Sequence, residues 1–330
     1  AIVCPVAPER WGPFSLDTGI GGSEEAVIRL SRAFSNRGHT VTVYGSGWVG
    51  IDEVMWDVQQ RAWSVEYKSA VDYTSSDVVI HWRAPELFRD PRFEGTWKAL
   101  WLHDSCDPER IEPISDAIDL IWCISEYHAG LYSKLPRVYA GRNGIDPWEF
   151  EWAEQTPNLT KNPIKFVYIS TPFRGLDILL NMWPQIRQRI PMAEIHAYYG
   201  WDSSGQSLAT PEGQAFKDYV MRLAEQDGVA WHGRIGQREL YREVLSAGVW
   251  AYPSRHPEEQ CISSYIAQAC GTWPVVYPLG ALPQSVVFGW KVKPHEFIDA
   301  IEAAAKREDG RQTMADWARK YLSWDDVATE

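Results

Sequence analysis

The chain has 330 residues, of which 45% are hydrophobic and 23% are charged, and its formal net charge is -12. This length and composition predict a globular protein with two domains. The negative charge argues against a general nucleic-acid-binding protein, because such proteins gain affinity by neutralising phosphates. The longest apolar runs, such as residues 120–124 and 275–277, are much shorter than the ~20 residues that a membrane-spanning helix requires.

The cysteines and the first residues of the sequence bear on its location. The five cysteines form an odd set without Cys-x-x-Cys spacing, which predicts reduced thiols and neither a zinc site nor a disulfide framework: Cys4, Cys106, Cys123, Cys261 and Cys270. Residues 1–7 are typical of a strand and lack the charged start and cleavage site of a secretory signal. A cytoplasmic location is therefore expected.

Residues 1–150 alternate β-rich and helical patterns, which is typical of a parallel sheet covered by helices. Residues 1–7 form the first expected strand, and a helix should follow the segment Gly19-Ile20-Gly21-Gly22-Ser23. Apolar residues at helical spacing support that helix: Val27, Leu30 and Phe34. Further strands are expected at 39–44, 77–82, 99–102 and 120–125. The pattern predicts a doubly wound first domain.

A polar, proline-bounded stretch at 151–163 is predicted to be the domain linker. The second domain, 164–310, repeats the alternating pattern, with strands expected at 165–169, 194–199, 229–232 and 249–252. Helices are expected between them, at 176–190, 211–226 and 237–247. Residues 311–330 should form a C-terminal helix, and its return to the first domain is left open. The predicted fold class is α/β, with two Rossmann-like domains.

The glycines between the first strand and the first helix allow a close approach of a ligand to the backbone. Gly21 and Gly22 fit this role, although a tight turn without a ligand explains them equally well. A dinucleotide-binding fingerprint fits poorly, because it requires a small residue where Glu24 stands. It also requires an acidic residue after the second strand, which ends instead in Tyr44-Gly45-Ser46.

Several short motifs occur in order along the chain. They are Gly21-Gly22-Ser23-Glu24, His103-Asp104, Arg142-Asn143-Gly144-Ile145-Asp146, Arg174-Gly175, His232-Gly233-Arg234, Glu258-Glu259-Gln260-Cys261, Ala269-Cys270-Gly271-Thr272 and Ser323-Trp324-Asp325-Asp326. Each motif is weak alone, but over nearly the whole length their order resembles retaining GT-B glycosyltransferases of the GT4 type. The resemblance implies two Rossmann-like domains that face each other across a cleft. It also implies transfer of a hexose from a nucleoside-diphosphate sugar to a hydroxyl, with the anomeric configuration retained.

The resemblance implies donor-binding residues in the second domain. Arg174 matches the basic residue that binds the pyrophosphate, and an ordinary surface ion pair is its alternative role. Glu258 matches the first carboxylate of the Glu-x7-Glu motif, which lies by the transferred sugar. The second carboxylate is replaced by Ile266, which removes a ribose contact. The remaining donor-binding positions are a strand-end serine and a helix start whose amides cradle phosphate or whose serines cap the helix: Ser170, Cys261, Ile262, Ser263 and Ser264.

In the first domain, the resemblance implies that His103 bonds the outer hydroxyl of the donor sugar, with Asp104 orienting the ring. A structural histidine is the alternative. Gly21 and Gly22 would face the phosphates and the sugar from the same side. Relatives carry a second basic residue at the phosphate site, and Arg234 or Arg255 would have to supply it here.

The chain contains no Asp-x-Asp motif, which predicts metal-independent catalysis. No cofactor is expected beyond the donor substrate, a UDP-sugar in first place and a GDP-sugar as the alternative. The acceptor is a hydroxyl of a glycan, a small glycoside, a protein or a modified nucleic-acid base, and the sequence does not fix the oligomeric state. Because of Ile266 and the missing second basic residue, a nucleotide-sugar-binding protein with little or no transfer activity stays open as an alternative. A sugar-nucleotide epimerase of the same fold is a third possibility.

Overall fold

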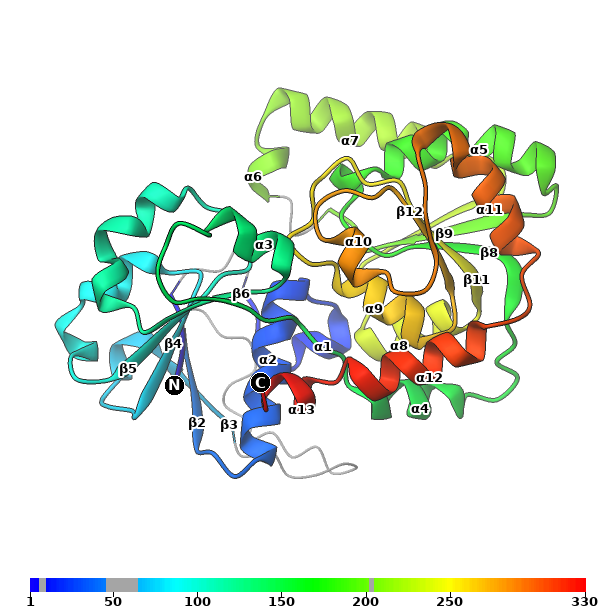
Figure 1. Ribbon diagram of the computed structural model, residues 1–330. Helices are drawn as coiled ribbons and strands as arrows, with labels where there is room; N and C mark the ends of the chain where they lie inside the picture. Colours follow the sequence, from blue (N-terminus) through cyan, green and yellow to red (C-terminus); the bar gives the residue numbers. More distant parts are fainter. Residues whose placement is uncertain (6–9, 46–64, 202–204) are drawn as a thin grey trace. The chain divides into compact units, whose positions relative to one another are not determined.

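The computed structural model describes residues 1–5, 10–45, 65–201 and 205–330 (Figure 1). The chain folds into two compact units. The first consists of Ala1–Ser15, Gly21–Gly144 and Trp324–Glu330, and the second of Leu16–Ile20 and Ile145–Ser323. The last seven residues therefore belong to the first unit, where α13 (Trp324–Val327) packs against α2 (Gly22–Asn36).

The first unit is built on a seven-stranded parallel sheet with the order β3-β2-β1-β4-β5-β6-β7. Its strands are β1 (Ile2–Cys4), β2 (Val41–Gly45), β3 (Val65–Ser69), β4 (Val78–Trp82), β5 (Trp97–Trp101), β6 (Leu120–Cys123) and β7 (Val138–Ala140). Positions 6 and 7 of the predicted first strand, and Ser46 after the second, lie outside the described residues. The doubly wound sheet predicted from the alternating pattern is confirmed.

Short turns take the place of long helices in the second half of this unit. After β3, β4 and β5 the chain forms 3-10 turns: η1 (Ala70–Asp72), η2 (Pro85–Arg89), η3 (Pro91–Phe93), η4 (Pro108–Arg110) and η5 (Glu112–Ala117). Four of these turns carry a proline in their first two positions, where its missing amide costs no hydrogen bond. Only α3 (Glu126–Leu131) adds a helical turn next to β6 and β7.

The second unit holds a six-stranded parallel sheet with the order β10-β9-β8-β11-β12-β13. Its strands are β8 (Asn162–Tyr168), β9 (Glu194–Tyr198), β10 (Val229–Gly233), β11 (Ala247–Tyr252), β12 (Trp273–Val276) and β13 (Trp290–Lys291). The central strand β11 is buried along its whole length, as a parallel strand covered on both faces should be.

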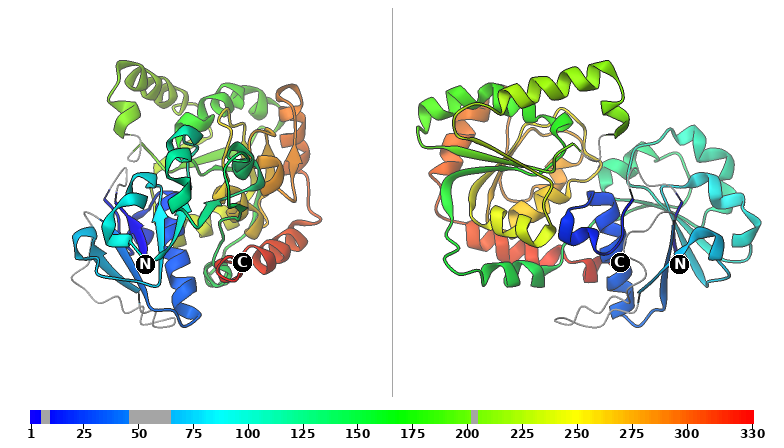
Figure 2. Two further views of the ribbon diagram at one scale, coloured as in Figure 1. Left: turned by 60° about the vertical axis from the view of Figure 1, so that its left-hand side comes forward. Right: turned by 180° about the vertical axis from the view of Figure 1, so that it is seen from behind.

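Two helical layers cover this sheet (Figures 1 and 2). One layer holds α5 (Leu176–Arg189), α7 (Pro211–Leu223) and α11 (Phe297–Ala305), and the other holds α4 (Pro147–Glu154), α8 (Gln237–Leu245), α9 (Ile262–Ala269) and α12 (Arg311–Tyr321). Shorter pieces are α1 (Ser15–Thr18), η6 (Pro172–Arg174), α6 (Gly205–Leu208), α10 (Leu282–Ser285) and η8 (Pro294–Glu296). The apolar face of α5 is buried, for example at Leu179, Leu180 and Trp183.

The boundary between the units lies ahead of the predicted linker at 151–163. Residues from Ile145 onward belong to the second unit, and the first part of the predicted linker continues α4. Phe150 and Ala153 of this helix are fully buried in the second core, and the Phe150 ring stacks on Tyr241 with centroids 4.5 Å apart. The sequence around them is polar because α4 turns its other face outward.

A buried histidine in the first unit makes its stability depend on pH. His81 of β4 is fully buried, and its ring centroid lies 4.4 Å from that of Phe88 and 4.7 Å from that of Phe93. Neither ring nitrogen has a hydrogen-bond partner among the described residues. Burial, assisted by the charge of Lys98, lowers the pKa of His81 from 6.5 to about 4.

The lowered pKa of His81 predicts a loss of stability in mild acid. The His81 side chain of the unfolded chain takes up a proton near pH 6.5, whereas that of the folded chain does so only near pH 4. The neutral, buried His81 therefore contributes fully to the free energy of unfolding above pH 6.5, and this contribution is lost as the pH falls to about 4. We expect His81→Phe to remove about 3 kcal/mol of the acid-induced loss in the free energy of unfolding. Urea unfolding at pH 7, 5.5 and 4.5 measures this. Equal pH dependence in both proteins would contradict the prediction.

Candidate functional site

The strand order of the second unit places a topological switch point between β8 and β11, and we call the region beyond their carboxyl ends the crevice. The chain leaves these neighbouring strands toward opposite sides, and ligands of parallel sheets bind at the carboxyl ends of strands at such a switch point. The segments that follow the two strands are Ile169–Gly175 and Pro253–Cys261. Between them they contain four of the residues predicted to contact the donor: Ser170, Arg174, Glu258 and Cys261.

Gly175 brings these two segments into contact. Its backbone has φ +120°, and a Cβ at this position would overlap the carbonyl oxygen of Pro253 and lie 3.2 Å from the Cα of Ser254. Glycine alone adopts this conformation without strain and leaves room for the neighbouring backbone. The residue thus fixes Arg174, at the end of η6, beside the chain that follows β11.

Arg174 and Glu258 form an ion pair in this crevice. Nη1 of Arg174 donates to Oε2 of Glu258; the Glu258 side chain is 1% exposed and that of Arg174 is 33% exposed. Burial would lower the pKa of Arg174, but the charge of Glu258 and its neighbours outweighs burial and raises it. The structure therefore brings together the two residues that sequence reasoning placed at the diphosphate and at the sugar.

Tyr252, at the end of β11, is a residue of this site that the sequence analysis did not identify. Its hydroxyl donates to Oε1 of Glu258 at 2.6 Å and lies 3.1 Å from Oγ of Ser170. Burial and then the charge of Glu258 raise the pKa of Tyr252, so its hydroxyl stays protonated. Only its position, six residues before Glu258 at the end of an expected strand, pointed to a role.

The start of α9 lies at the end of β8. The hydroxyl of Ser263 donates to the carbonyl of Ile169 at 2.9 Å, and that of Ser264 donates to the carbonyl of Cys261 at 2.6 Å. Cys261 is the N-cap residue, and no side chain caps the helix. The amide of Ser264 also bonds the carbonyl of Cys261, so within the predicted cradle the amides of Ile262 and Ser263 are the ones placed to meet an anion.

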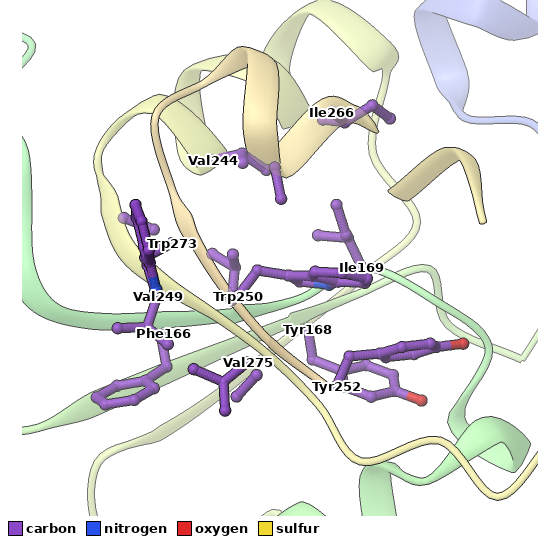
Figure 3. Close-up of a cluster of buried hydrophobic side chains, with 14 of the residues drawn as sticks. Phe166, Tyr168, Ile169, Val244, Val249, Trp250, Tyr252, Ile266, Trp273 and Val275 are labelled. Carbon is purple, nitrogen blue, oxygen red and sulfur yellow. The ribbon is translucent and has the colours of Figure 1, made fainter. Parts of the chain in front are cut away.

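Ile266, one turn further along α9, is 4% exposed and belongs to the buried core of the second unit (Figure 3). Its side chain offers no acceptor for a ribose hydroxyl.

Burial raises the pKa of the Cys261 thiol, with the charge of Glu258 as the next cause. The thiol therefore stays neutral beside the carboxylate.

The two candidates for a second cation are engaged with other groups. Arg255 donates to the carboxylate of Asp177 in the first turn of α5. The guanidinium of Arg234 lies 5.0 Å from the ring centroid of Tyr199, whose φ of +100° is unusual for a residue other than glycine. Arg234 follows β10 and Arg255 follows β11, so both lie at the carboxyl edge of the sheet that carries the crevice.

In the first unit, the predicted glycines lie at the start of α2. Gly21 is the N-cap residue, and its carbonyl accepts the amide of Glu25 at 2.9 Å. Gly22 is the first residue of the helix, and no side chain caps it. The strand order of this unit places its own switch point between β1, which precedes these glycines, and β4.

His103 follows β5 and is 5% exposed. Its ring packs edge-on against Trp101, with centroids 4.3 Å apart, and lies 6.1 Å from Trp82. Asp104 does not bond the His103 ring in this structure but pairs with Arg83, which also lies 3.4 Å from Glu24. The two tryptophan rings pack against the ring of His103 and restrict its orientation.

Comparison with solved structures identifies the architecture. The sucrose-phosphate synthase of Thermosynechococcus elongatus aligns over 99% of this chain and 96% of its own, with a TM-score of 0.70 and 16% identity. The trehalose-6-phosphate synthase OtsA aligns over the same shares, with a TM-score of 0.73 and 12% identity. The chain has the GT-B fold. Another GT-B protein, Anabaena HepE solved in complex with UDP-glucose, covers 99% of this chain and 96% of its own, with a TM-score of 0.68 and 12% identity.

Similarity in sequence covers a smaller part of the chain than similarity in structure. No protein-family model matches it. A curated D-inositol 3-phosphate glycosyltransferase of Saccharomonospora viridis is 28% identical over 164 residues, which are 46% of this chain and 37% of that protein. The chain thus matches little more than a third of this relative's length. The resemblance to GT-B glycosyltransferases predicted from the motifs is confirmed by the fold and by the class of these relatives.

Across residues 1–5, 10–45, 65–201 and 205–330, no helix has the length and apolar character needed to span a membrane. In the same part of the chain, no three His, Cys, Asp or Glu side chains are grouped so that they could hold a metal ion.

Proposed function

We propose that this protein is a retaining glycosyltransferase that moves a hexose from a nucleoside-diphosphate sugar to a hydroxyl acceptor. The observation that carries the proposal is the meeting of Arg174, Glu258 and the start of α9 at the crevice between β8 and β11. A guanidinium and helix amides suit a diphosphate, and a carboxylate beside them suits a sugar whose anomeric carbon becomes positive. HepE, a protein of the same fold, was solved with UDP-glucose, which supports a UDP-sugar as the donor.

In this proposal, Arg174 and the amides of Ile262 and Ser263 stabilise the departing diphosphate. Glu258 accepts hydroxyl bonds from the sugar and favours the charge that develops at its anomeric carbon. The leaving phosphate takes the proton of the acceptor hydroxyl on the same face, which retains the configuration. No step requires a metal ion, because Arg174 and the helix start supply the positive charge.

The first unit supplies the acceptor side in this proposal. His103 bonds the donor sugar, and Gly21 and Gly22 let the backbone approach it. The acceptor is a hydroxyl of a glycan, a small glycoside, a protein or a modified base, and the reaction takes place in the cytoplasm. These points follow from the resemblance and need their own tests.

One observation favours a second function. Because Ile266 offers no carboxylate for the ribose, and Arg255 is paired with Asp177, the donor loses two contacts that relatives are expected to make. A nucleotide-sugar-binding protein with little transfer activity would have the same crevice.

A panel of UDP-, GDP- and ADP-sugars separates these functions. We expect UDP and one UDP-sugar to raise the melting temperature by several degrees, as binding to the folded state requires. We also expect slow hydrolysis of that sugar without an acceptor, measured by chromatography of released UDP. Binding without hydrolysis or transfer would favour the binding protein, and a changed sugar still attached to UDP would indicate an epimerase. If no nucleotide sugar bound, the proposed function would be wrong.

A further inference from the structure

We infer that Tyr252 is a positioning residue that holds Glu258 in place while Arg174 exchanges this carboxylate for the diphosphate of the donor. This inference rests on the proposed function and adds a residue to it. It starts from the two oxygens of Glu258, which have different partners: Oε1 accepts from Tyr252, and Oε2 accepts from Arg174.

The two partners of Glu258 differ in their freedom to move. The Arg174 side chain is 33% exposed and ends a long, flexible stem, so its guanidinium can turn toward a phosphate. Tyr252 is fully buried in the core. Its ring stacks on Trp250 with centroids 4.8 Å apart and lies 5.6 Å from the ring of Tyr168 (Figure 3). A side chain packed in this way keeps its rotamer, so Tyr252 stays when Arg174 leaves.

The direction of the hydrogen bonds supports this role. An ionised carboxylate can only accept hydrogen bonds, so the hydroxyl of Tyr252 donates its single proton to Glu258. Ser170, 3.1 Å away, must therefore be the donor in its bond to Tyr252. The chain from Ser170 through Tyr252 to Glu258 is polarised toward the carboxylate, which strengthens the last bond.

A buried carboxylate needs such a bond when its counter-charge moves away. Glu258 is 1% exposed, and an unpaired charge at such a site is strongly unfavourable. With Arg174 bound to the diphosphate, Oε1 stays on Tyr252 and Oε2 becomes the oxygen that can accept a hydroxyl of the sugar. Tyr252 thereby decides which oxygen of Glu258 meets the donor.

The variant Tyr252→Phe tests the inference, with Tyr198→Phe as a matched control. Tyr198 lies on β9, is 3% exposed and donates to Oε2 of Glu243 at 2.7 Å, so its loss removes the same kind of bond outside the crevice. We expect Y252F to lower the kcat for turnover of the nucleotide sugar by about 10- to 100-fold, which is the effect of losing one hydrogen bond to a charged group. The Kd for UDP, measured by calorimetry, should change less than about threefold, because Arg174 and α9 are intact.

The outcomes are distinguishable. Y198F should keep kcat within about twofold of the wild type, and thermal unfolding should show a similar loss of stability in both variants. The positioning role alone would be overturned if Y252F had the same kcat as the wild type, or if Y252F and Y198F lost the same fraction of kcat. A weaker binding of UDP with unchanged kcat would overturn it too. A wild-type protein that turns over no nucleotide sugar in the same assay would overturn the proposed function, and this inference with it.

Discussion

The variant Glu258→Gln is expected to lower the rate of sugar transfer by about 10³-fold, the loss typical of removing one strong electrostatic contact to a transition state. Gln keeps the shape of Glu258 and an acceptor for Tyr252, but it removes the charge that would favour a positive anomeric carbon. The same change should tighten UDP binding by about three- to tenfold, because Arg174 no longer has to leave an ion pair. Initial rates of product formation and calorimetry with UDP measure the two effects.

Glu259 provides the matched control, because it is the neighbouring carboxylate and is also buried. One of its contacts is with His256, whose Nε2 lies 3.7 Å from Oε2 of Glu259. Glu259→Gln should keep transfer within about threefold of the wild type. The reverse result, with E259Q inactive and E258Q active, would assign the role at the sugar to Glu259.

The variant Gly175→Ala should lower both stability and donor affinity. The residue has φ +120°, and its new Cβ would overlap the Pro253 carbonyl, which is backbone and cannot turn away. We expect a loss of about 3 kcal/mol in the free energy of unfolding and UDP binding at least about tenfold weaker, because the clash moves Arg174 away from the segment after β11. Urea unfolding and calorimetry measure the two losses.

Gly38→Ala separates backbone strain from the clash. Gly38 has φ +89°, and nothing lies within 4 Å of a Cβ built there. This variant should lose only about 1 kcal/mol of stability and keep its affinity for UDP. If G175A behaved like G38A, the contact between the two segments would not shape the donor site.

The sequence was enough to group Arg174, Glu258 and Ser170 but not to find Tyr252, for a physical reason. Arg174, Glu258 and Ser170 follow strands β8 and β11, and strand ends of a parallel sheet meet at one edge. Motif order along the chain was therefore enough to group them. Tyr252 was missed because a tyrosine at the end of a buried strand is usually a core residue. Its hydrogen bond to Glu258 depends on side-chain geometry, which the sequence does not show.

Other features could not be read from local patterns. No residue of the edge strand β3 is buried, and the edge strands β7 and β13 have only three and two residues. These three strands therefore show no long apolar run. The ion pair of Asp104 with Arg83 was not predicted, because it joins the ends of two neighbouring strands, β4 and β5, whose residues lie 21 positions apart in the sequence. Long-range ion pairs of this kind leave no periodic signal.

The assignment of Trp324–Glu330 to the first unit bears on how the protein is made. During synthesis, residues 324–330 of the first unit leave the ribosome only after residues 145–323, which belong to the second unit. Domains usually fold as units as the chain emerges, the N-terminal one first. Here the N-terminal unit still lacks α13 when residues 145–323 of the second unit have been made. A recombinant fragment that stops at Gly144 would leave α2 without the helix that packs against it.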